Sequence, residues 1–300
     1  MYSKQKIVFI VNPFSGAKSK NALPTLIDQY LDKSKFDYEL QFTESAGHAS
    51  VLAQQAVESH TDIVVACGGD GTVNEVAKSI VNQKTALGII PYGSGNGFAM
   101  HIGLGRNIKK AIKILNTAES KCIDSCTVND RFFLNLAGVG FDALIAFKAH
   151  EGEKRGFKMY FNLVRKEIFN FKAPEFTVKL NNKSIEGPFT TIAVANAAMY
   201  GYNFTVAPLA EMTDGLLDVV FIKKASIFRI LLSTWRMLNN SLHKSRLVSI
   251  EKCKTVTIES KYPYYFHIDG ESFEFSKPLN FELLPKSINV LFPASKLSRF

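Results

Sequence analysis

One short segment, Asp62–Ala77, restricts the fold more than any other part of the sequence. An apolar, β-branched strand over Ile63–Cys67 leads into three glycines interrupted by Asp70, and a helical pattern begins near Thr72. Glycines permit positive φ and close ligand approach, and amides at a helix N-terminus suit phosphate oxygens. An ordinary strand-to-helix turn, with Thr72 as N-cap and Glu75 completing a capping box, fits the same residues. That simpler interpretation leaves Asp70 unexplained, because its carboxylate would repel a phosphate unless a divalent cation lay between them.

Two more glycine-rich loops follow predicted strands. Asn12–Gly16 comes after the strand Lys6–Val11, and Pro91–Gly97 comes after the strand Leu87–Ile90. The carboxyl ends of parallel strands meet at one edge of a sheet, so the three loops together predict a cleft lined for phosphate.

Two common nucleotide motifs do not fit. A P-loop pattern is absent, and Gly138–Ala143 matches only the loose dinucleotide pattern, without the acidic residue expected further along. Structural glycines, or a wall of the same cleft, are favoured at Gly138–Ala143.

The pattern of predicted secondary structure changes near residue 125. Before it, strands alternate with helices, which predicts a mostly parallel α/β sheet; after it, short strands and turns predict an antiparallel β-sandwich or barrel. We therefore expect an α/β domain over residues 1–125 and a β-sandwich domain over 126–287, with 288–300 packing back on the first domain. The predicted helices of the first domain span 21–33, 47–58, 73–82 and 107–117, and a further strand spans Asp37–Thr43; those of the second span 141–150, 158–169 and 225–242.

Composition excludes several classes of protein. Of 300 residues, 46% are hydrophobic and 21% charged, which excludes a disordered or fibrous chain. Four cysteines without a Cys-x-x-Cys pair indicate reduced thiols in a cytoplasmic protein. The two long uncharged stretches, Thr85–Gly105 and Pro188–Ala210, are broken by Gly, Pro and Asn, so neither is predicted to span a membrane.

The net charge of +9 points to polyanionic partners, and most of it is local. Lys223–Lys254 holds eight Lys and Arg against one Glu. Two interpretations stay open for the helix in this segment: a core-packing helix with a solvated face, or a helix that docks on an anionic membrane. The apolar stripe of that helix comprises Ile227, Phe228, Leu231, Trp235, Leu238 and Leu242.

Taken in order, the three glycine loops resemble the diacylglycerol kinase catalytic-domain family, which includes bacterial lipid kinases and the sphingosine and ceramide kinases. The loop Gly68–Thr72 alone also occurs in NAD kinases and phosphofructokinases, whereas the ordered set is specific. The resemblance spans nearly the whole chain, through Asn12–Gly16, Gly68–Glu75, Pro91–Asn96, Asn135–Asp142, Ala207–Val219 and Asp269–Glu271.

This resemblance implies a two-domain kinase with ATP and Mg²⁺ in the cleft between the α/β domain and the β-sandwich. One departure concerns the acceptor. Gly97 follows Asn96, whereas many bacterial members have Asp at that position, and Gly-Ser-Gly-Asn instead resembles the corresponding loop of the sphingosine kinases. Diacylglycerol, a monoacylglycerol and a sphingoid base are therefore all open as acceptors. The residues implied to surround ATP are Asn12, Pro13, Phe14, Ser15, Gly16, Thr43, Gly69, Asp70, Gly71, Thr72, Val73, Asn74, Glu75 and Ser94.

Three carboxylates carry the catalysis that the resemblance implies. Glu271 would accept the proton of the lipid hydroxyl, while Asp269 and Asp70 would hold catalytic magnesium directly or through water. Asp124 either joins this network or caps a strand end. Asp269–Gly270 also predicts a type I′ hairpin turn by itself, so a plain turn stays open.

A structural magnesium is implied in the segment Pro208–Asp218. Its ligands would be the carboxylate of Asp214 and the backbone carbonyls of Glu211 and Leu216. A plain turn over Thr213–Gly215, before the strand Leu217–Ile222, fits the same residues.

The predicted function is thus ATP-dependent phosphorylation of a membrane lipid by a cytoplasmic protein in peripheral contact with an anionic membrane. The alternatives are a kinase of a soluble substrate such as NAD, or a basic nucleotide- or nucleic-acid-binding protein without catalysis. Nucleic acid is not the expected partner, because no nucleic-acid-binding motif is present. A homodimer is left open.

Overall fold

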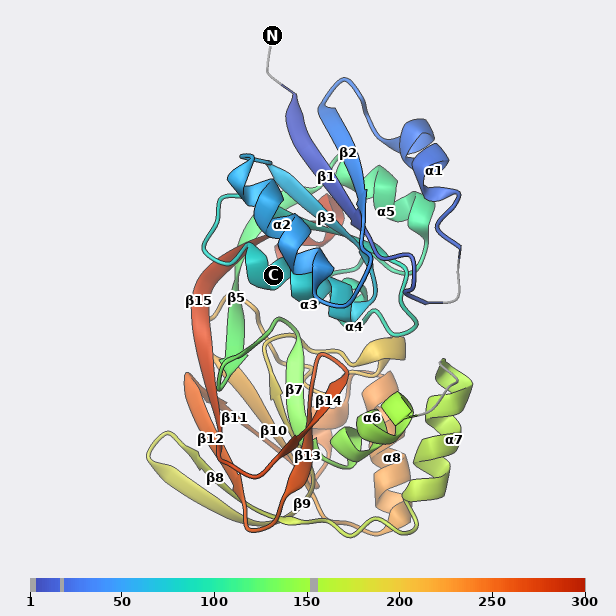
Figure 1. Cartoon of the computed structure of the whole chain (residues 1–300). Coiled ribbons are helices and arrows are strands. Elements are labelled where there is room, and N and C mark those ends of the chain that lie inside the picture. Colours follow the sequence, from blue (N-terminus) through green and yellow to red (C-terminus); the bar gives the residue numbers. More distant parts are fainter. Residues whose placement is uncertain (1–3, 17–18, 152–155, 300) are drawn as a thin grey trace. The chain divides into compact units, whose positions relative to one another are not determined.

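The computed structural model describes residues 4–16, 19–151 and 156–299 (Figure 1). The chain forms two compact units, one of Met1–Ile123 with Lys286–Phe300 and one of Asp124–Pro285. It leaves the first unit within strand β5 (Glu119–Val128) and returns to it within strand β15 (Leu279–Phe292).

The first unit is an α/β domain. Strands β1 (Gln5–Val11), β2 (Phe36–Phe42), β3 (Ile63–Gly68) and β4 (Ala86–Pro91) are all parallel, and the end of β15 joins β4 through the pairs Asn289–Ala86 and Val290–Leu87. The order across the sheet is β15-β4-β3-β1-β2. This arrangement confirms the predicted α/β class. The helices are α1 (Leu23–Tyr30), α2 (His48–Glu58), α3 (Asp70–Ser79), α4 (Gly97–His101) and α5 (Ile108–Leu115).

The central strands of this sheet are apolar on both faces, so helices cover both faces of the sheet. Alternate side chains of β1, Ile7, Phe9 and Val11, pack in one cluster with α1 and α5. Helices α2 and α3 contact each other and lie together in Figure 1. Such burial on both faces is typical of parallel sheets joined by crossover helices.

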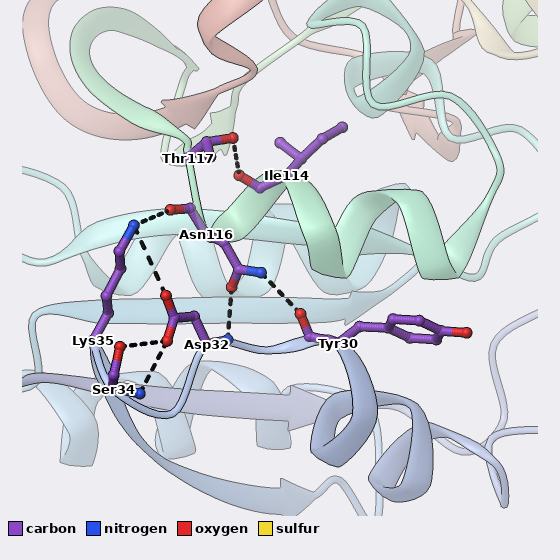
Figure 2. Close-up of polar contacts among 7 residues, drawn as sticks. All are labelled: Tyr30, Asp32, Ser34, Lys35, Ile114, Asn116 and Thr117. Carbon is purple, nitrogen blue, oxygen red and sulfur yellow. Dashed lines mark hydrogen bonds and ion pairs between the residues drawn. The ribbon is translucent and has the colours of Figure 1, made fainter.

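A polar network fastens α1 to α5 at the N-terminal edge of this sheet (Figure 2). The Asn116 side chain accepts from the Asp32 amide at 2.9 Å and donates to the Tyr30 carbonyl at 2.8 Å. Lys35 Nζ donates to the Asn116 carbonyl at 3.0 Å, and the Lys35 carbonyl accepts from the amide of Gln5, where β1 begins. The ends of the two helices are thereby held at the edge opposite the glycine loops.

The second unit is an antiparallel β-sandwich, as predicted. One layer contains β8 (Glu175–Leu180), β12 (Thr255–Ser260) and the start of β15; the other contains β7 (Leu136–Gly140), β10 (Leu217–Lys223), β11 (Val248–Cys253), β13 (Tyr264–Ile268) and β14 (Glu271–Phe275). Strand β9 (Lys183–Ala195) pairs with β8 in its first half and with β7 and β10 in its second. A short strand, β6 (Arg131–Phe133), pairs with β5.

Alternate residues of both layers form the core of this unit. Phe176 and Val178 of β8 pack in the same cluster as Phe221 of β10 and Phe266 of β13. Helices α6 (Phe141–Glu151), α7 (Phe157–Glu167) and α8 (Ile227–Leu238) interrupt the strands.

Three strands are longer than the segments that the sequence pattern predicts, which are Thr127–Val128, Thr190–Asn196 and Leu279–Leu284. Strand β9 runs through Gly187 and Pro188, residues that normally end a strand, and β5 and β15 begin or end well outside the predicted short segments. Their neighbours supply hydrogen bonds along the full length, which local propensity does not register.

Candidate functional site

The three glycine loops lie at the carboxyl edge of neighbouring parallel strands. Asn12 follows β1, Gly68 ends β3 and Gly69 follows it, and Tyr92 and Gly93 follow β4. Since β3 pairs with both β1 and β4, the loops are adjacent in space. The sheet edge predicted for phosphate binding therefore exists within the first unit.

Asn12 joins the first loop to the second. Its Nδ2 donates to Thr72 Oγ1 at 3.0 Å, while its Oδ1 accepts from the Phe14 amide at 2.9 Å. The Asn12 amide donates to the Cys67 carbonyl, and the Ser15 hydroxyl donates to the Asn12 carbonyl. One side chain thus shapes its own loop and attaches it to helix α3.

Glycines bring the loops into backbone contact. Gly16 has φ of +58°, and a Cβ there would lie 1.9 Å from the Tyr92 carbonyl oxygen. A Cβ on Gly93 would lie 2.5 Å from the Cα of Gly69. No larger residue fits these contacts without moving backbone, so glycine at both positions is explained by close packing of the loops.

Helix α3 begins at Asp70, two residues earlier than the predicted start near Thr72, with Gly69 as its N-cap. Asp70 lies in the first turn, where the helix dipole stabilises an anionic side chain. Its Oδ1 accepts from the Phe98 amide at 3.4 Å, which links it to α4 after the third loop. The carboxylate is half-buried at the loop edge.

Glu75 does not complete a capping box for α3. Its two carboxylate oxygens accept from the amides of Gly47 and Ala49, at 3.0 and 3.2 Å, and so cap the start of α2. The capping-box interpretation is therefore wrong, because the Glu75 carboxylate, within α3, caps the start of a different helix. Its predicted contact with ATP stays a prediction.

The other residues predicted around ATP differ in exposure. Thr43 is buried after β2, and its amide donates to the Val11 carbonyl at 2.9 Å. Ser94 is half-buried in the third loop. Of the rest, Ser15, Thr72 and Val73 are buried, Gly71 and Asn74 are half-buried, and Pro13 and Phe14 are exposed.

One basic residue at this edge was not predicted. Lys20 is only 6% exposed, and its ammonium donates to the Ser15 carbonyl and lies 5.3 Å from the centre of the Tyr92 ring. Burial lowers its pKa below the ordinary value. A lysine shortly after a glycine loop was the available signal, but the sequence does not tell which of many lysines turns inward.

In the second unit, the predicted catalytic pair lies on a hairpin. Asp269 and Gly270 both have positive φ, +48° and +92°, and Ile268 pairs with Glu271. This is the type I′ turn that Asp-Gly predicts. Glu271, the first residue of β14, is exposed.

The Asp269 carboxylate accepts from three consecutive backbone amides. Leu134 donates to Oδ2 at 3.0 Å, and Asn135 and Leu136 donate to Oδ1 at 3.1 and 3.0 Å. The Asp269 amide donates in return to the Leu136 carbonyl. Asp269 therefore fixes the hairpin tip to the start of β7, and its part in holding magnesium stays a prediction.

The predicted structural metal site lies on a loop before β10. Asp214 Oδ1 accepts from the Leu216 amide at 3.0 Å, and Lys252 Nζ lies 2.7 Å from Asp214 Oδ2 and 2.9 Å from Asp218 Oδ2. Asp124 Oδ2 accepts from the Gly215 amide at 2.9 Å, and its own amide donates to the Met212 carbonyl. Burial raises the pKa of Asp218, and Lys252 opposes that shift.

These oxygen ligands are of the kind that Mg²⁺ takes, although Lys252 shares the Asp214 carboxylate. Among the described residues, no three acidic, histidine or cysteine side chains gather in a way that suits a metal. The predicted ligands are one carboxylate, that of Asp214, and the backbone carbonyls of Glu211 and Leu216. Metal binding by these three residues therefore stays a prediction.

Models of known protein families match both halves of the chain. The model of the diacylglycerol kinase catalytic domain matches residues 6–128, and that of the YegS C-terminal NAD kinase beta sandwich-like domain matches residues 135–292. The chain belongs to the diacylglycerol kinase catalytic-domain family. At the level of this family, the protein is a kinase.

Full-length relatives agree with this membership. The chain is 28% identical to a diacylglycerol kinase of Staphylococcus haemolyticus, covering 95% of this chain and 87% of the relative. It is 25% identical to a diacylglycerol kinase of Bacillus subtilis, covering 96% of each. A solved structure of a diacylglycerol kinase from Bacillus anthracis has the same fold, with a TM-score of 0.74 at 21% identity over 99% of this chain and 100% of that one.

A helix that crosses a bilayer has to be long and predominantly apolar. Within the described residues, no helix has both the length and the apolar character needed to cross a bilayer.

Proposed function

We propose that this protein transfers the γ-phosphoryl group of ATP to the hydroxyl group of a membrane lipid. The observation that carries the proposal is the joined set of three loops around Asp70, in a chain whose full-length relatives are diacylglycerol kinases. A diacylglycerol or a sphingoid base would be the acceptor.

The first unit would bind the nucleotide. The loops of Asn12–Gly16 and Gly69–Glu75, with Thr43 and Ser94, offer backbone amides and hydroxyls to phosphate oxygens. Lys20 adds a positive charge beside the first loop. Magnesium bound with ATP would screen the charge of the phosphates, and the Asp70 carboxylate in the first turn of α3 would hold it.

Glu271 would serve the acceptor. The lipid hydroxyl oxygen forms a bond to the γ-phosphorus while the bond from that phosphorus to the bridging oxygen of ADP breaks. The hydroxyl proton passes to the Glu271 carboxylate, and the products are ADP and a lipid phosphate. An exposed carboxylate on a rigid hairpin suits this role, since proton transfer needs a base at a fixed position.

The acceptor is tested with labelled ATP and a panel of diacylglycerol, monoacylglycerol, sphingosine, ceramide and NAD, with the mass of each product determined. We expect a phosphorylated lipid. A product from NAD alone would contradict the lipid proposal and support the soluble-substrate alternative.

The role of Glu271 is tested against a matched glutamate on the same strand. Glu271→Gln should abolish transfer with an unchanged unfolding temperature, whereas Glu274→Gln, equally exposed on β14, should retain full activity. Activity of Glu271→Gln near that of the wild type would remove its assignment as the base.

We further propose that helix α8 docks on an anionic membrane, where a lipid substrate resides. Leu232, Trp235 and Leu238, spaced by three residues, are 52%, 62% and 52% exposed, whereas Ser233 is buried. Of the apolar stripe predicted for this segment, Trp235 and Leu238 are exposed, so core packing is wrong for these two, whereas Leu242 is buried as core packing requires. The side chains of Ile227, Phe228 and Leu231 lie outside the described residues. Exposed basic residues nearby are Lys223, Lys224, Arg229, Lys244 and Arg246.

An exposed apolar row flanked by basic residues suits the interface of an anionic bilayer. Each Lys or Arg near such a surface contributes about 1 kcal/mol. Sedimentation with vesicles of phosphatidylcholine, with and without phosphatidylglycerol, tests the contact. Trp235→Ala should weaken binding, whereas Tyr262→Ala, which alters an exposed aromatic between β12 and β13, should not. Binding that ignores lipid charge and Trp235 would contradict docking.

A further inference from the structure

A largely buried polar cluster in the second unit has no part in the chemistry proposed above. It consists of Asp142 at the start of α6, His267 on β13, Tyr200 and Thr191. His267 is only 2% exposed, although histidine is polar and lies two positions before the turn residue Asp269. Placing such groups inside a domain is costly unless they are paired, and here they are paired with one another.

The Asp142 carboxylate is the centre of the cluster. Its Oδ2 lies 2.9 Å from His267 Nε2 and accepts a short hydrogen bond from the Tyr200 hydroxyl, and its Oδ1 accepts from Thr191 Oγ1 at 3.4 Å. Because an ionised carboxylate only accepts hydrogen bonds, Nε2 of His267 donates to it. Burial and the nearby Asp142 charge raise the pKa of Tyr200 well above its usual value, so its hydroxyl keeps its proton and donates.

Glycines make room for this contact. Gly138 lies opposite His267 in the β7–β13 pairing, and a Cβ there would lie 3.0 Å from Asp142 Oδ2 and 3.3 Å from His267 Nε2. At Gly140, φ is +111°, and a Cβ would lie 2.4 Å from the Thr190 carbonyl oxygen. The pattern Gly-Val-Gly-Phe-Asp therefore permits the chain to turn from β7 into α6 with Asp142 facing His267.

The same helix contacts the hairpin a second time. Phe147 of α6 stacks on Tyr265 of β13, with ring centroids 3.9 Å apart and planes 19° from parallel. The hairpin is thus held on one side by β7, through pairs over Phe266–Ile268 and through Asp269, and on another by α6. Asp142 and His267 form the polar part of the α6 contact.

The position of Glu271 depends on this attachment. In the hairpin register, His267 pairs with Ser272 and Ile268 pairs with Glu271, so a shift of His267 moves the strand pair that begins β14. The contact of His267 Nε2 with Asp142 Oδ2 over 2.9 Å fixes β13 of this hairpin to helix α6. Displacement of a reacting group by about 1 Å can lower a rate by about a hundredfold.

We propose that Asp142 and His267 are positioning residues, which fix the β13–β14 hairpin on α6 so that Glu271 is held where the acceptor hydroxyl loses its proton. This inference rests on the proposed function, in which Glu271 is the base. Tyr200 and Thr191 orient the Asp142 carboxylate toward His267.

The kinetic test compares His267→Ala with His267→Gln, whose terminal NH₂ can replace the Nε2–H donor. We expect His267→Ala to lower kcat about tenfold or more while KM for ATP changes less than about twofold, since the nucleotide loops are untouched. His267→Gln should recover most of kcat. Val256→Ala, which removes buried volume from β12 in the other layer, is the control for general loss of stability and should keep the wild-type kcat.

A double-mutant cycle isolates the pair. If the contact positions the hairpin, adding Asp142→Ala to His267→Ala should lower kcat little further, because the interaction is already lost. Equal kcat in wild type and His267→Ala would overturn the proposal, as would fully additive losses.

Hydrogen exchange separates this inference from the proposed function. Amides in a peptide spanning Tyr264–Phe275 should exchange faster in His267→Ala than in wild type, and not in Val256→Ala. If the wild-type protein phosphorylates no lipid, the proposed function fails and exchange alone decides the positioning role. Unchanged exchange across the hairpin in His267→Ala would refute it.

Discussion

Asn12 Nδ2 donates a hydrogen bond to Thr72 Oγ1 over 3.0 Å, and this bond joins the loop after β1 to the first turn of α3. Sixty residues separate the two side chains in sequence. Through this bond and the contact of Gly69 with Gly93, the three loops form one connected edge, so a change in one loop should alter ATP binding by all three.

Replacing Thr72 with Val keeps the shape and removes the acceptor. We expect the free energy of unfolding to fall by about 1 kcal/mol, because Asn12 loses a hydrogen-bond partner. KM for ATP should rise about tenfold, the equivalent of 1.4 kcal/mol. The control is Thr85→Val. Thr85, directly before β4, is also buried, and its hydroxyl donates to the Thr61 carbonyl. It should lose similar stability with ATP kinetics unchanged, and an equal rise in its KM would count against a specific role for Thr72.

Lys20→Met should separate charge from packing at the loop edge. Methionine can fill the space of the buried stem, but it cannot donate to the Ser15 carbonyl or attract phosphate. We expect weaker ATP binding in calorimetry and an unfolding temperature equal to or above that of the wild type, since a desolvated ammonium is removed. Lys33→Met, at an exposed position, is the control. Unchanged ATP affinity in Lys20→Met would exclude Lys20 from the nucleotide site.

Magnesium should stabilise the second unit through Asp214. A ligand that binds only the native state raises the unfolding temperature by mass action, so Mg²⁺ added after chelation should raise it in the wild type. Asp214→Asn should show no such rise, and Asp130→Asn, on an exposed turn, should respond like the wild type.

Lys252 competes with the metal in this arrangement, because its ammonium lies 2.7 Å from Asp214 Oδ2. Lys252→Met should therefore respond more strongly to Mg²⁺ than the wild type. An equal response in Asp214→Asn and wild type would contradict metal binding by this loop.

The four thiols should differ sharply in reactivity. Burial raises the pKa of Cys253 to about 12 and that of Cys67 and Cys126 above the ordinary range, whereas Cys122 is exposed. Because the thiolate is the reactive form, one thiol per native chain should react with a disulfide reagent at pH 8, and four after unfolding. Cys122→Ser should remove the native reaction. A second fast thiol in the native protein would contradict the described burial.

Several local features were predictable because local chemistry decides them. Asp269–Gly270 forms the type I′ turn that this dipeptide favours, and the apolar run Ile63–Cys67 forms a strand buried on both faces. The glycines of the three loops were predicted to let a ligand approach the backbone, and this stays a prediction, because Gly16 and Gly93 show close packing of the loops against one another. For the turn and the strand, the determining interaction lies within a few residues of chain or in a period of hydrophobicity.

Other features depended on distant partners. Glu75 caps α2 rather than α3, since the Gly47 and Ala49 amides reach it from another helix. Trp235 and Leu238 fit an inward apolar stripe by periodicity, yet they are exposed because α8 turns Ser233 inward. Nothing local distinguishes buried Lys20 from the other lysines of the sequence, and the contact of Asp142 with His267, 125 residues apart, has no local signature.

By itself, then, the sequence determined the order of strands and helices, the two classes of domain and the loops suited to phosphate, because periodicity and turn chemistry act over short distances. The tertiary structure alone decided which polar side chains face one another: Asn12 with Thr72, Lys20 with the Ser15 carbonyl, and Asp142 with His267. Those contacts form only when the strands take their register, and register is a property of the assembled sheets.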